Sequence, residues 1–220
     1  MGILAVIPAR KGSKGIPDKN MQEICGRSLI EWAWLAADSI RGELTEIVVS
    51  TDYPDLPGHM TRLERPAELC QDDTPAVAVM RHAIEQRGGD AVLYLQPTSP
   101  FRKRIDLLSA CSVRYSAVSF VDVGEFHPAR MMRDIGAVEW LDRERCWDDR
   151  QCLPPMYIRD GGIYMVTRKD MPHWDGYSTV VPIVVHPDWS IRIDTPRDLI
   201  FARAMAQTQD LTELGILPNN

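Results

Sequence analysis

The sequence predicts an α/β fold built around a mostly parallel sheet. Three segments, at residues 3–7, 46–50 and 91–95, lack the polar alternation of half-exposed strands and are typical of strands buried on both faces; the first and third are apolar throughout and the second is apolar at 47–49. Segments with helical apolar spacing separate these runs. Strand, helix and strand in this order imply right-handed βαβ units, which place successive strands parallel in one sheet.

Helix start and stop signals delimit the segments between the strands. Ser28 and Glu31 form a capping box, which predicts a helix that ends near Ser39. Thr74 as N-cap with Pro75 at the first helical position predicts a second helix, which stops at the glycine pair before the third run. The remaining expected elements are a helix at 105–113, strands at 117–121, 180–185 and 191–194, and a last helix capped by Thr195.

Length and composition limit the class of protein. The 220 residues, 45% of them hydrophobic, fit one domain spanning 1–220 with a real core. The net charge of −6 argues against nucleic acid as a partner, because phosphate-backbone binding needs an excess of Lys and Arg. The five cysteines are widely spaced without a C-x-x-C pattern, which supports neither a disulfide framework nor a zinc site. No apolar run approaches membrane-spanning length and no signal peptide is present, so we expect a cytoplasmic protein without membrane partners.

A basic loop follows the first apolar run. Arg10, Lys11, Lys14 and Lys19 crowd around two glycines and a serine. Open α/β sheets bind ligands at the carboxyl ends of their strands, and glycines there let backbone N–H groups approach an anion. A polyphosphate is therefore the expected ligand, although such a loop also occurs as a solvated turn and neither familiar phosphate-loop pattern is present.

The text of this loop, IPARKGSKGIPDKN at 7–20, resembles the amino-terminal signature of acylneuraminate cytidylyltransferases, roughly A-R-x-G-S-K-G-[IL]-P-x-K-N. Further matches are S-T-D at 50–52, R-P-A-E-L at 65–69 and L-Q-P-T-S-P-F-R at 95–102, and together the matches span nearly the whole chain. The resemblance implies a Rossmann-like three-layer nucleotidyltransferase fold, with a dimerisation arm and a homodimer.

The resemblance also implies a nucleotide site. Arg10 and Lys19 would be catalytic, because nucleotidyl transfer depends on positioning and on charge stabilisation at the phosphates. Asn20 would support the loop or the nucleotide, and Arg65 would lie beside the phosphates or base; a surface ion pair with a neighbouring glutamate is the alternative for Arg65. The implied nucleotide-binding set is Arg10, Gly12, Ser13, Lys19, Asn20 and Arg65.

An acceptor site is implied at the next strand end. Gln96, Thr98 and Ser99 carry an amide and two hydroxyls that can converge on a sugar, although two prolines also make this a plain polar turn. Arg130, in the motif H-P-x-[RK], is where relatives place a cation near the sugar or phosphates. The expected acceptor is an acidic nine-carbon keto sugar.

Two segments depart from regular patterning. Residues 124–175 lose clear periodicity over much of their length, and relatives use this region as an insertion for dimerisation and sugar binding. Between Asp52 and Arg65 relatives carry a helix and a short strand, whereas this chain has a shortened stretch with two prolines and a glycine.

The metal site is the main departure from the family pattern. Many relatives read S-I-D-I-D-T, with two acids on one side of a strand that share Mg²⁺. Here the text is S-I-R-I-D-T, so Asp194 remains the expected ligand for Mg²⁺ or Mn²⁺, while Arg192 replaces the first acid. Arg192 could instead pair with Asp194 or touch the phosphate directly. Asp160 likewise replaces an asparagine, which removes an amide donor.

The function expected from these residues is transfer of CMP from CTP to the anomeric hydroxyl of a sialic-acid-like nonulosonic acid, with release of pyrophosphate. Two alternatives remain open: a related nucleotidyltransferase that uses another nucleotide or a sugar phosphate, and a catalytically impaired homologue that only binds nucleotide.

Overall fold

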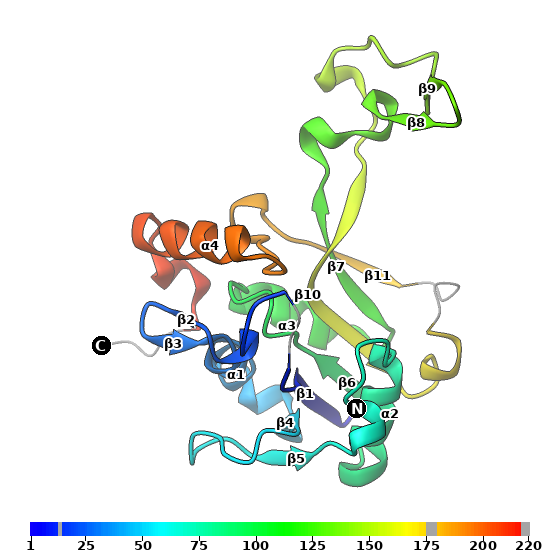
Figure 1. Cartoon of the computed structure of the whole chain (residues 1–220). Coiled ribbons are helices and arrows are strands. Elements are labelled where there is room, and N and C mark those ends of the chain that lie inside the picture. The colour runs from blue at the N-terminus through cyan, green and yellow to red at the C-terminus, as the bar shows by residue number, and fades with distance from the viewer. Residues whose placement is uncertain (13–14, 175–179, 217–220) are drawn as a thin grey trace.

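A single large sheet forms the centre of the protein in the computed structural model, which describes residues 1–12, 15–174 and 180–216. Its strands are β1 (Ile3–Ala9), β4 (Glu46–Thr51), β5 (Arg62–Glu64), β6 (Ala91–Tyr94), β7 (Ala117–Asp122), β10 (Tyr157–Thr167) and β11 (Val181–Val184). Within the described residues the strand order is β11-β7-β10-β6-β1-β4-β5 (Figure 1).

The sheet is mostly parallel, as the sequence predicts. β1 pairs in parallel with both β4 and β6, β4 with β5, and β11 with β7. β10 is the exception, since it runs antiparallel to β6 and to β7. The carboxyl ends of β1, β4 and β6 therefore meet at one edge, where ligand sites of open α/β sheets lie.

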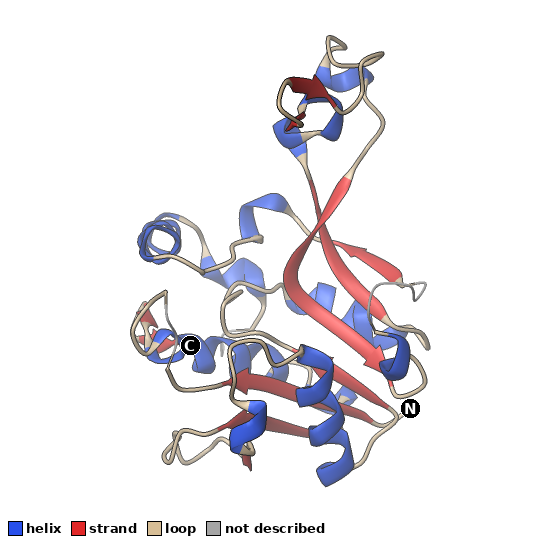
Figure 2. Cartoon of the chain, turned by 45° about the vertical axis from the view of Figure 1, so that its right-hand side comes forward, coloured by secondary structure: helices blue, strands red, loops and turns tan. Residues whose placement is uncertain are grey.

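Helices cover both faces of the sheet and complete three layers (Figure 2). Alternate residues of β1 point to opposite faces of the sheet. Leu4 and Val6 belong to the hydrophobic cluster on one face, and Ile3, Ala5 and Ile7 belong to the cluster on the other face. All five side chains are buried. The first face carries α2 (Ala76–Arg87), and the second carries α1 (Leu29–Asp38), α3 (Arg104–Ser112) and α4 (Pro196–Thr208).

Capping boxes begin α1 and α4. The Ser28 N–H donates to Glu31 Oε2 at 2.7 Å and the Glu31 N–H donates to Ser28 Oγ at 3.3 Å. Thr195 and Asp198 exchange the same two bonds at 2.8 and 3.3 Å. Both predicted starts are confirmed, and α1 ends with Ser39 as its C-cap. None of the helices in the described residues combines the length and apolar character needed to cross a bilayer.

Two local expectations are wrong. Pro75, rather than Thr74, occupies the N-cap of α2, and the cap lacks a side-chain hydrogen bond. No strand forms at 191–194, although Ile193 donates one backbone hydrogen bond to the Thr98 carbonyl at 2.8 Å. Two buried isoleucines alternate there with two exposed polar residues, which imitates the period of a strand without a pairing partner.

An arm, residues 123–156, leaves the body between β7 and β10 and stands clear of the sheet at the top of Figure 1. It contains the ribbon of β8 (Met132–Asp134) and β9 (Val138–Trp140). The insertion expected over 124–175 is thus shorter, because the chain rejoins the central sheet as β10 from Tyr157.

The shortened unit after β4 keeps one of its two expected parts. β5 forms and pairs with β4 at the sheet edge, so the short strand is retained. No helix occurs between Asp52 and β5, a stretch that the structure describes completely.

Candidate active site

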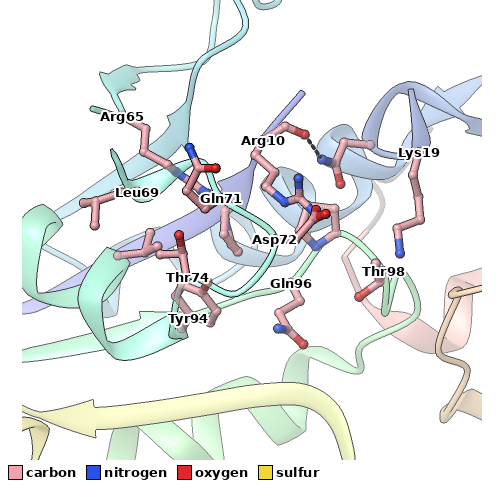
Figure 3. Close-up of a pocket in the computed structure, with 14 residues that line it drawn as sticks. Arg10, Lys19, Arg65, Leu69, Gln71, Asp72, Thr74, Tyr94, Gln96 and Thr98 are labelled. Carbon is pink, nitrogen blue, oxygen red and sulfur yellow. Dashed lines mark hydrogen bonds and ion pairs between the residues drawn. The ribbon is translucent and has the colours of Figure 1, made fainter. Parts of the chain in front are cut away.

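A cavity of about 200 Å³ opens at the carboxyl ends of β1, β4 and β6 (Figure 3). The segments that follow β1, β5 and β6 supply most of its walls, which explains how residues far apart in sequence meet there. Six of the predicted site residues line it: Arg10, Lys19, Asn20, Arg65, Gln96 and Thr98.

Four other predicted residues lie elsewhere or outside the described part. Gly12 has a φ of +80°, a left-handed conformation that favours glycine in the basic loop. Ser13 lies outside the described residues. Ser99 is buried beneath the turn and its hydroxyl has no hydrogen-bond partner. Arg130 is exposed on the arm, where it donates to the Asp148 carbonyl at 3.2 Å, and it does not line the cavity at the strand ends.

Arg10 already holds an anion in the free protein. Its Nη2 forms an ion pair with the carboxylate of Asp72, which also lines the cavity. The Asn20 amide donates to the Arg10 carbonyl at 2.9 Å and so steadies the start of the loop. The guanidinium is therefore presented to the cavity with one acidic partner, as a site for anionic groups.

Lys19 joins the cavity to the segment before α4. Its Nζ donates to the Ile193 carbonyl and to Asp194 Oδ1, both at 3.2 Å. Only 16% of its side chain is exposed, so its charge is held close to the cavity wall.

Arg65 is buried rather than paired at the surface. Its Nε donates to Ser50 Oγ at 3.1 Å and its Nη2 to the Ser50 carbonyl at 2.6 Å. Burial lowers the pKa of its guanidinium, which Tyr94 partly opposes. The alternative of a surface ion pair with Glu64 or Glu68 is not what the structure shows.

A second cavity, of about 220 Å³, adjoins the first and shares Tyr94 and Gln96 with it. Arg159 and Tyr164, both from β10, lie on its wall together with apolar side chains. Gln96 therefore stands at the boundary between a cationic cavity and a mixed one, a layout suited to bringing two substrates together.

Known proteins are similar to this chain over nearly its full length. A family model described as cytidylyltransferase matches residues 4–109. A CMP-N,N'-diacetyllegionaminic acid synthase from Legionella pneumophila is 31% identical over 234 aligned residues, which cover 98% of this chain and 98% of that protein. The chain belongs to the acylneuraminate cytidylyltransferase family. It is accordingly a nucleotidyltransferase.

Other members and structures agree with this assignment. An N-acylneuraminate cytidylyltransferase from Escherichia coli is 25% identical over 99% of this chain, which spans about half of that longer enzyme, 55% of its length. The solved structure of a CMP:2-keto-3-deoxy-manno-octonic acid synthetase complexed with CTP superposes with a TM-score of 0.68 at 17% identity, covering 95% of this chain and all of that one. The cytidylyltransferase fold is thus shared.

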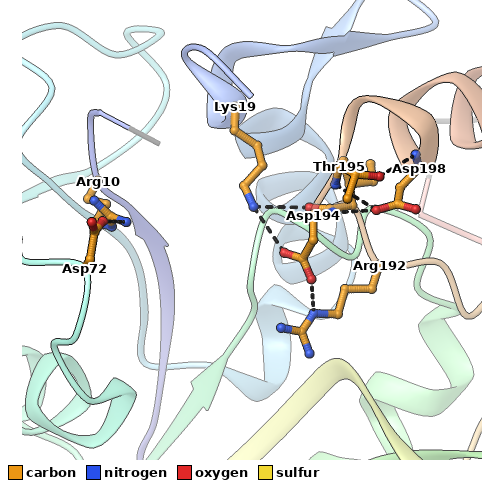
Figure 4. A network of polar contacts seen from close by, with 8 residues as sticks. Arg10, Lys19, Asp72, Arg192, Asp194, Thr195 and Asp198 are labelled. Carbon is orange, nitrogen blue, oxygen red and sulfur yellow. Dashed lines mark hydrogen bonds and ion pairs between the residues drawn. The ribbon is translucent and has the colours of Figure 1, made fainter. Parts of the chain in front are cut away.

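Asp194, the acid that this family member retains, is surrounded by cations (Figure 4). Its Oδ1 accepts from Lys19 at 3.2 Å and its Oδ2 pairs with Arg192 Nε at 2.8 Å. The nearby Asp198 carboxylate is occupied by the N–H groups of Asp194 and Thr195. Across the described residues, no group of three or more His, Cys, Asp and Glu is placed to hold a metal ion. One carboxylate with two cationic partners does not fit a divalent ion held by the protein alone.

Arg102, the last residue of the motif at 95–102, has a structural role at this site that the motif did not predict. It is buried, and it donates to the Gln96 carbonyl at 2.5 Å and to the Gly162 carbonyl at 2.6 Å. Burial lowers its pKa to about 10, which the charge of Asp160 opposes. Arg102 therefore ties the Gln96 turn to β10.

Asp160 has taken a new role in place of the family's asparagine. Its carboxylate accepts from the Ser119 hydroxyl and, at 3.0 Å, from the Gly162 N–H. The Asp160 carboxylate is therefore engaged by donors of its own chain. Its negative charge also favours the charged form of the buried Arg102.

Proposed function

We propose that this protein transfers CMP from CTP to the anomeric hydroxyl of a sialic-acid-like nonulosonic acid and releases pyrophosphate. The observation that carries the proposal is the pair of adjoining cavities that meet at Gln96, one rich in cations and the other with Arg159 on an apolar wall. The Legionella relative, a CMP-N,N'-diacetyllegionaminic acid synthase matched over 98% of both chains, supports an acceptor of this class.

The first cavity would take the nucleotide. Arg10 grips two phosphate oxygens in its planar fork after exchanging Asp72 for the ligand, while Lys19 supplies a point charge from the opposite side. The attraction between these two cations and the phosphates strengthens as negative charge builds up on the leaving pyrophosphate. Both cations therefore stabilise the transition state more than the bound substrate.

The second cavity would take the acceptor. Its apolar side chains, Val77, Met80 and Trp174, suit the ring and acyl substituents of a nonulosonic acid, and Arg159 offers a cation to its carboxylate. Gln96, at the boundary, offers an amide to the hydroxyl that reacts. The acceptor oxygen would thereby face the α-phosphorus of CTP from the adjoining cavity.

The bond changes are those of an in-line displacement. The acceptor oxygen forms a bond to the α-phosphorus as the bond between that phosphorus and the bridging oxygen breaks, and pyrophosphate leaves with the electron pair. The hydroxyl proton passes to water. The protein contributes position and charge, and Mg²⁺ or Mn²⁺ would enter with CTP as part of the substrate, because phosphate oxygens and water supply most of its ligands.

The test of this proposal is a pyrophosphate-release assay with a panel of substrates. CTP, GTP, ATP and UTP are each combined with N-acetylneuraminate, legionaminate and pseudaminate, and turnover with CTP and at least one of these acids is expected. Turnover with another nucleotide or only with sugar phosphates would favour the related transferase. CTP binding without turnover on any acceptor, at saturating Mg²⁺ and Mn²⁺, would favour the impaired homologue.

Gln96→Ala is expected to raise KM for the acceptor about 10- to 100-fold, the effect of losing one or two hydrogen bonds to a substrate. KM for CTP changes less, because cations dominate the first cavity. Steady-state kinetics with each substrate varied in turn measure both constants. Gln207→Ala, on the exposed face of α4, is the matched control and leaves both constants unchanged. An equal rise in both KM values would contradict the assignment of Gln96 to the acceptor.

A homodimer formed through the arm is also proposed. The arm exposes large apolar side chains that a monomer would leave in water, among them Ile135, Val138 and Trp147, the last 85% exposed. Light scattering is expected to give about twice the 24.9 kDa of one chain. Trp147→Glu lowers the measured mass toward that of the monomer, whereas Tyr115→Glu, at an aromatic residue of the body that is 69% exposed, does not. A monomer at all concentrations would refute the dimer.

A further inference from the structure

Arg192 is the side chain whose position the family pattern does not explain. It stands where relatives have the first of two metal-binding acids, and its Nε contacts Asp194 Oδ2 at 2.8 Å. Its side chain is 58% exposed, so packing does not require it there. An exposed guanidinium that contacts one carboxylate still has N–H groups to offer a ligand.

Arg192 lies beside Gln96, the residue that marks the junction of the two cavities, although its own side chain lines neither of them. A Cβ built on Gly161 would be 3.7 Å from Arg192 Cδ and 3.6 Å from Gln96 Oε1, so the two side chains flank the same glycine. On the other cavity wall, burial raises the pKa of Tyr164, and the charges of Arg159 and Arg192 oppose that rise. Arg192 therefore lies close to the junction at which the α-phosphorus and the acceptor would meet.

Arg192 places a positive charge beside Asp194, where the family pattern has a second acid. A pair of acids presents two negative charges, which attract a divalent cation. Lys19, Asp194 and Arg192 carry two positive charges and one negative charge in a single network (Figure 4). The Asp198 carboxylate, which accepts from the Asp194 N–H, balances these charges. Both carboxylate oxygens of Asp194 are nevertheless taken by cations, so a metal ion would have to displace them, whereas a phosphate can accept hydrogen bonds from them.

We propose that Arg192 is a catalytic residue that supplies, as a fixed cation at the α-phosphate, charge that a protein-held divalent ion would otherwise bring. This inference rests on the proposed function. Asp194 then acts as a positioning residue, which holds Arg192 and Lys19 at the junction until the triphosphate arrives. The guanidinium donates to a non-bridging oxygen of the α-phosphate and stabilises the charge that develops as pyrophosphate leaves.

The first test is equilibrium binding of CTP to the full chain in excess EDTA, by calorimetry. The wild-type protein is expected to bind CTP in EDTA with a Kd within about threefold of its value in Mg²⁺. Arg192→Ala weakens metal-free binding about tenfold or more, as expected for one lost charge-assisted hydrogen bond, and Arg192→Lys recovers part of the loss. Arg197→Ala, an exposed arginine in the first turn of α4, is the matched control and binds as wild type. Wild-type binding that is lost in EDTA, or an Arg192→Ala protein that binds as wild type there, would overturn the proposal.

The second test measures metal binding without nucleotide, by the electron paramagnetic resonance signal of Mn²⁺. Arg192→Asp restores two acids one residue apart and is expected to bind Mn²⁺ at least tenfold more tightly than wild type. Equal Mn²⁺ affinities would overturn the proposal. Neither readout uses the acceptor, so failure of the substrate panel and failure of these two measurements are separate results.

Discussion

Arg10→Ala is expected to lower kcat/KM for CTP by about 10²- to 10³-fold, the range found when one preorganised charge-stabilising donor is removed. Arg10 is the predicted phosphate ligand whose guanidinium is turned into the first cavity and held there by Asp72 (Figure 3). The fork that grips two phosphate oxygens is lost, and the Asp72 carboxylate stays at the phosphate site without the charge of Arg10 beside it. Both changes act on the charge that builds up on pyrophosphate, so kcat falls together with kcat/KM.

Two variants separate this effect from a general loss of charge. Arg10→Lys keeps the charge without the fork, and its kcat/KM lies between those of alanine and wild type. Lys11→Ala removes the adjacent exposed cation and is expected to change kcat/KM less than threefold, because only its backbone N–H is engaged, by Asp52. An Arg10→Ala enzyme within threefold of wild type would show that CTP is held elsewhere.

Arg102→Leu is expected to lower the free energy of unfolding by about 3–5 kcal/mol. The leucine leaves the Gln96 and Gly162 carbonyls without the donor that Arg102 supplied. It also removes the positive charge of Arg102, with which the negative charge of Asp160 interacts favourably. Because the Gln96 turn is then no longer tied to β10, KM for the acceptor rises as well. Urea denaturation at neutral pH measures the first effect and steady-state kinetics the second.

Arg114→Leu is the control for this change, since it removes an exposed arginine near the start of β7 and is expected to alter unfolding by about 0.5 kcal/mol or less. If Arg102→Leu unfolds within 1 kcal/mol of wild type, the tie between the Gln96 turn and β10 is not what holds this part of the structure.

The strands and caps that rest on local signals were predictable from the sequence. The apolar runs that became β1, β4 and β6 carry their own period, and the Ser28 and Thr195 boxes are completed within four residues. β10 was not predicted, because Asp160 and two glycines interrupt its apolar pattern and its partners come from other parts of the chain.

Some features of the candidate site were likewise predictable from the sequence and others were not. The basic loop and the Gln96 turn each follow a strand, so topology alone predicts that they converge. The pairing of Arg10 with Asp72 joins residues 62 positions apart and has no local signal, and Arg192 was recognised only as a departure whose contact had to be seen. Arg130 was expected near the substrates, but the arm carries it away from the body of its own chain.

Asp72 gives the free enzyme a resident anion, so capture of a nucleotide is an ion exchange rather than the filling of an empty basic pocket. An incoming phosphate must outcompete a tethered carboxylate, which a single chloride or inorganic phosphate ion from solution does poorly. The carboxylate is also at hand to reclaim Arg10 when pyrophosphate departs. Such a site is expected to ignore background salt anions, to prefer polyanions over simple ones and to clear its inorganic product quickly.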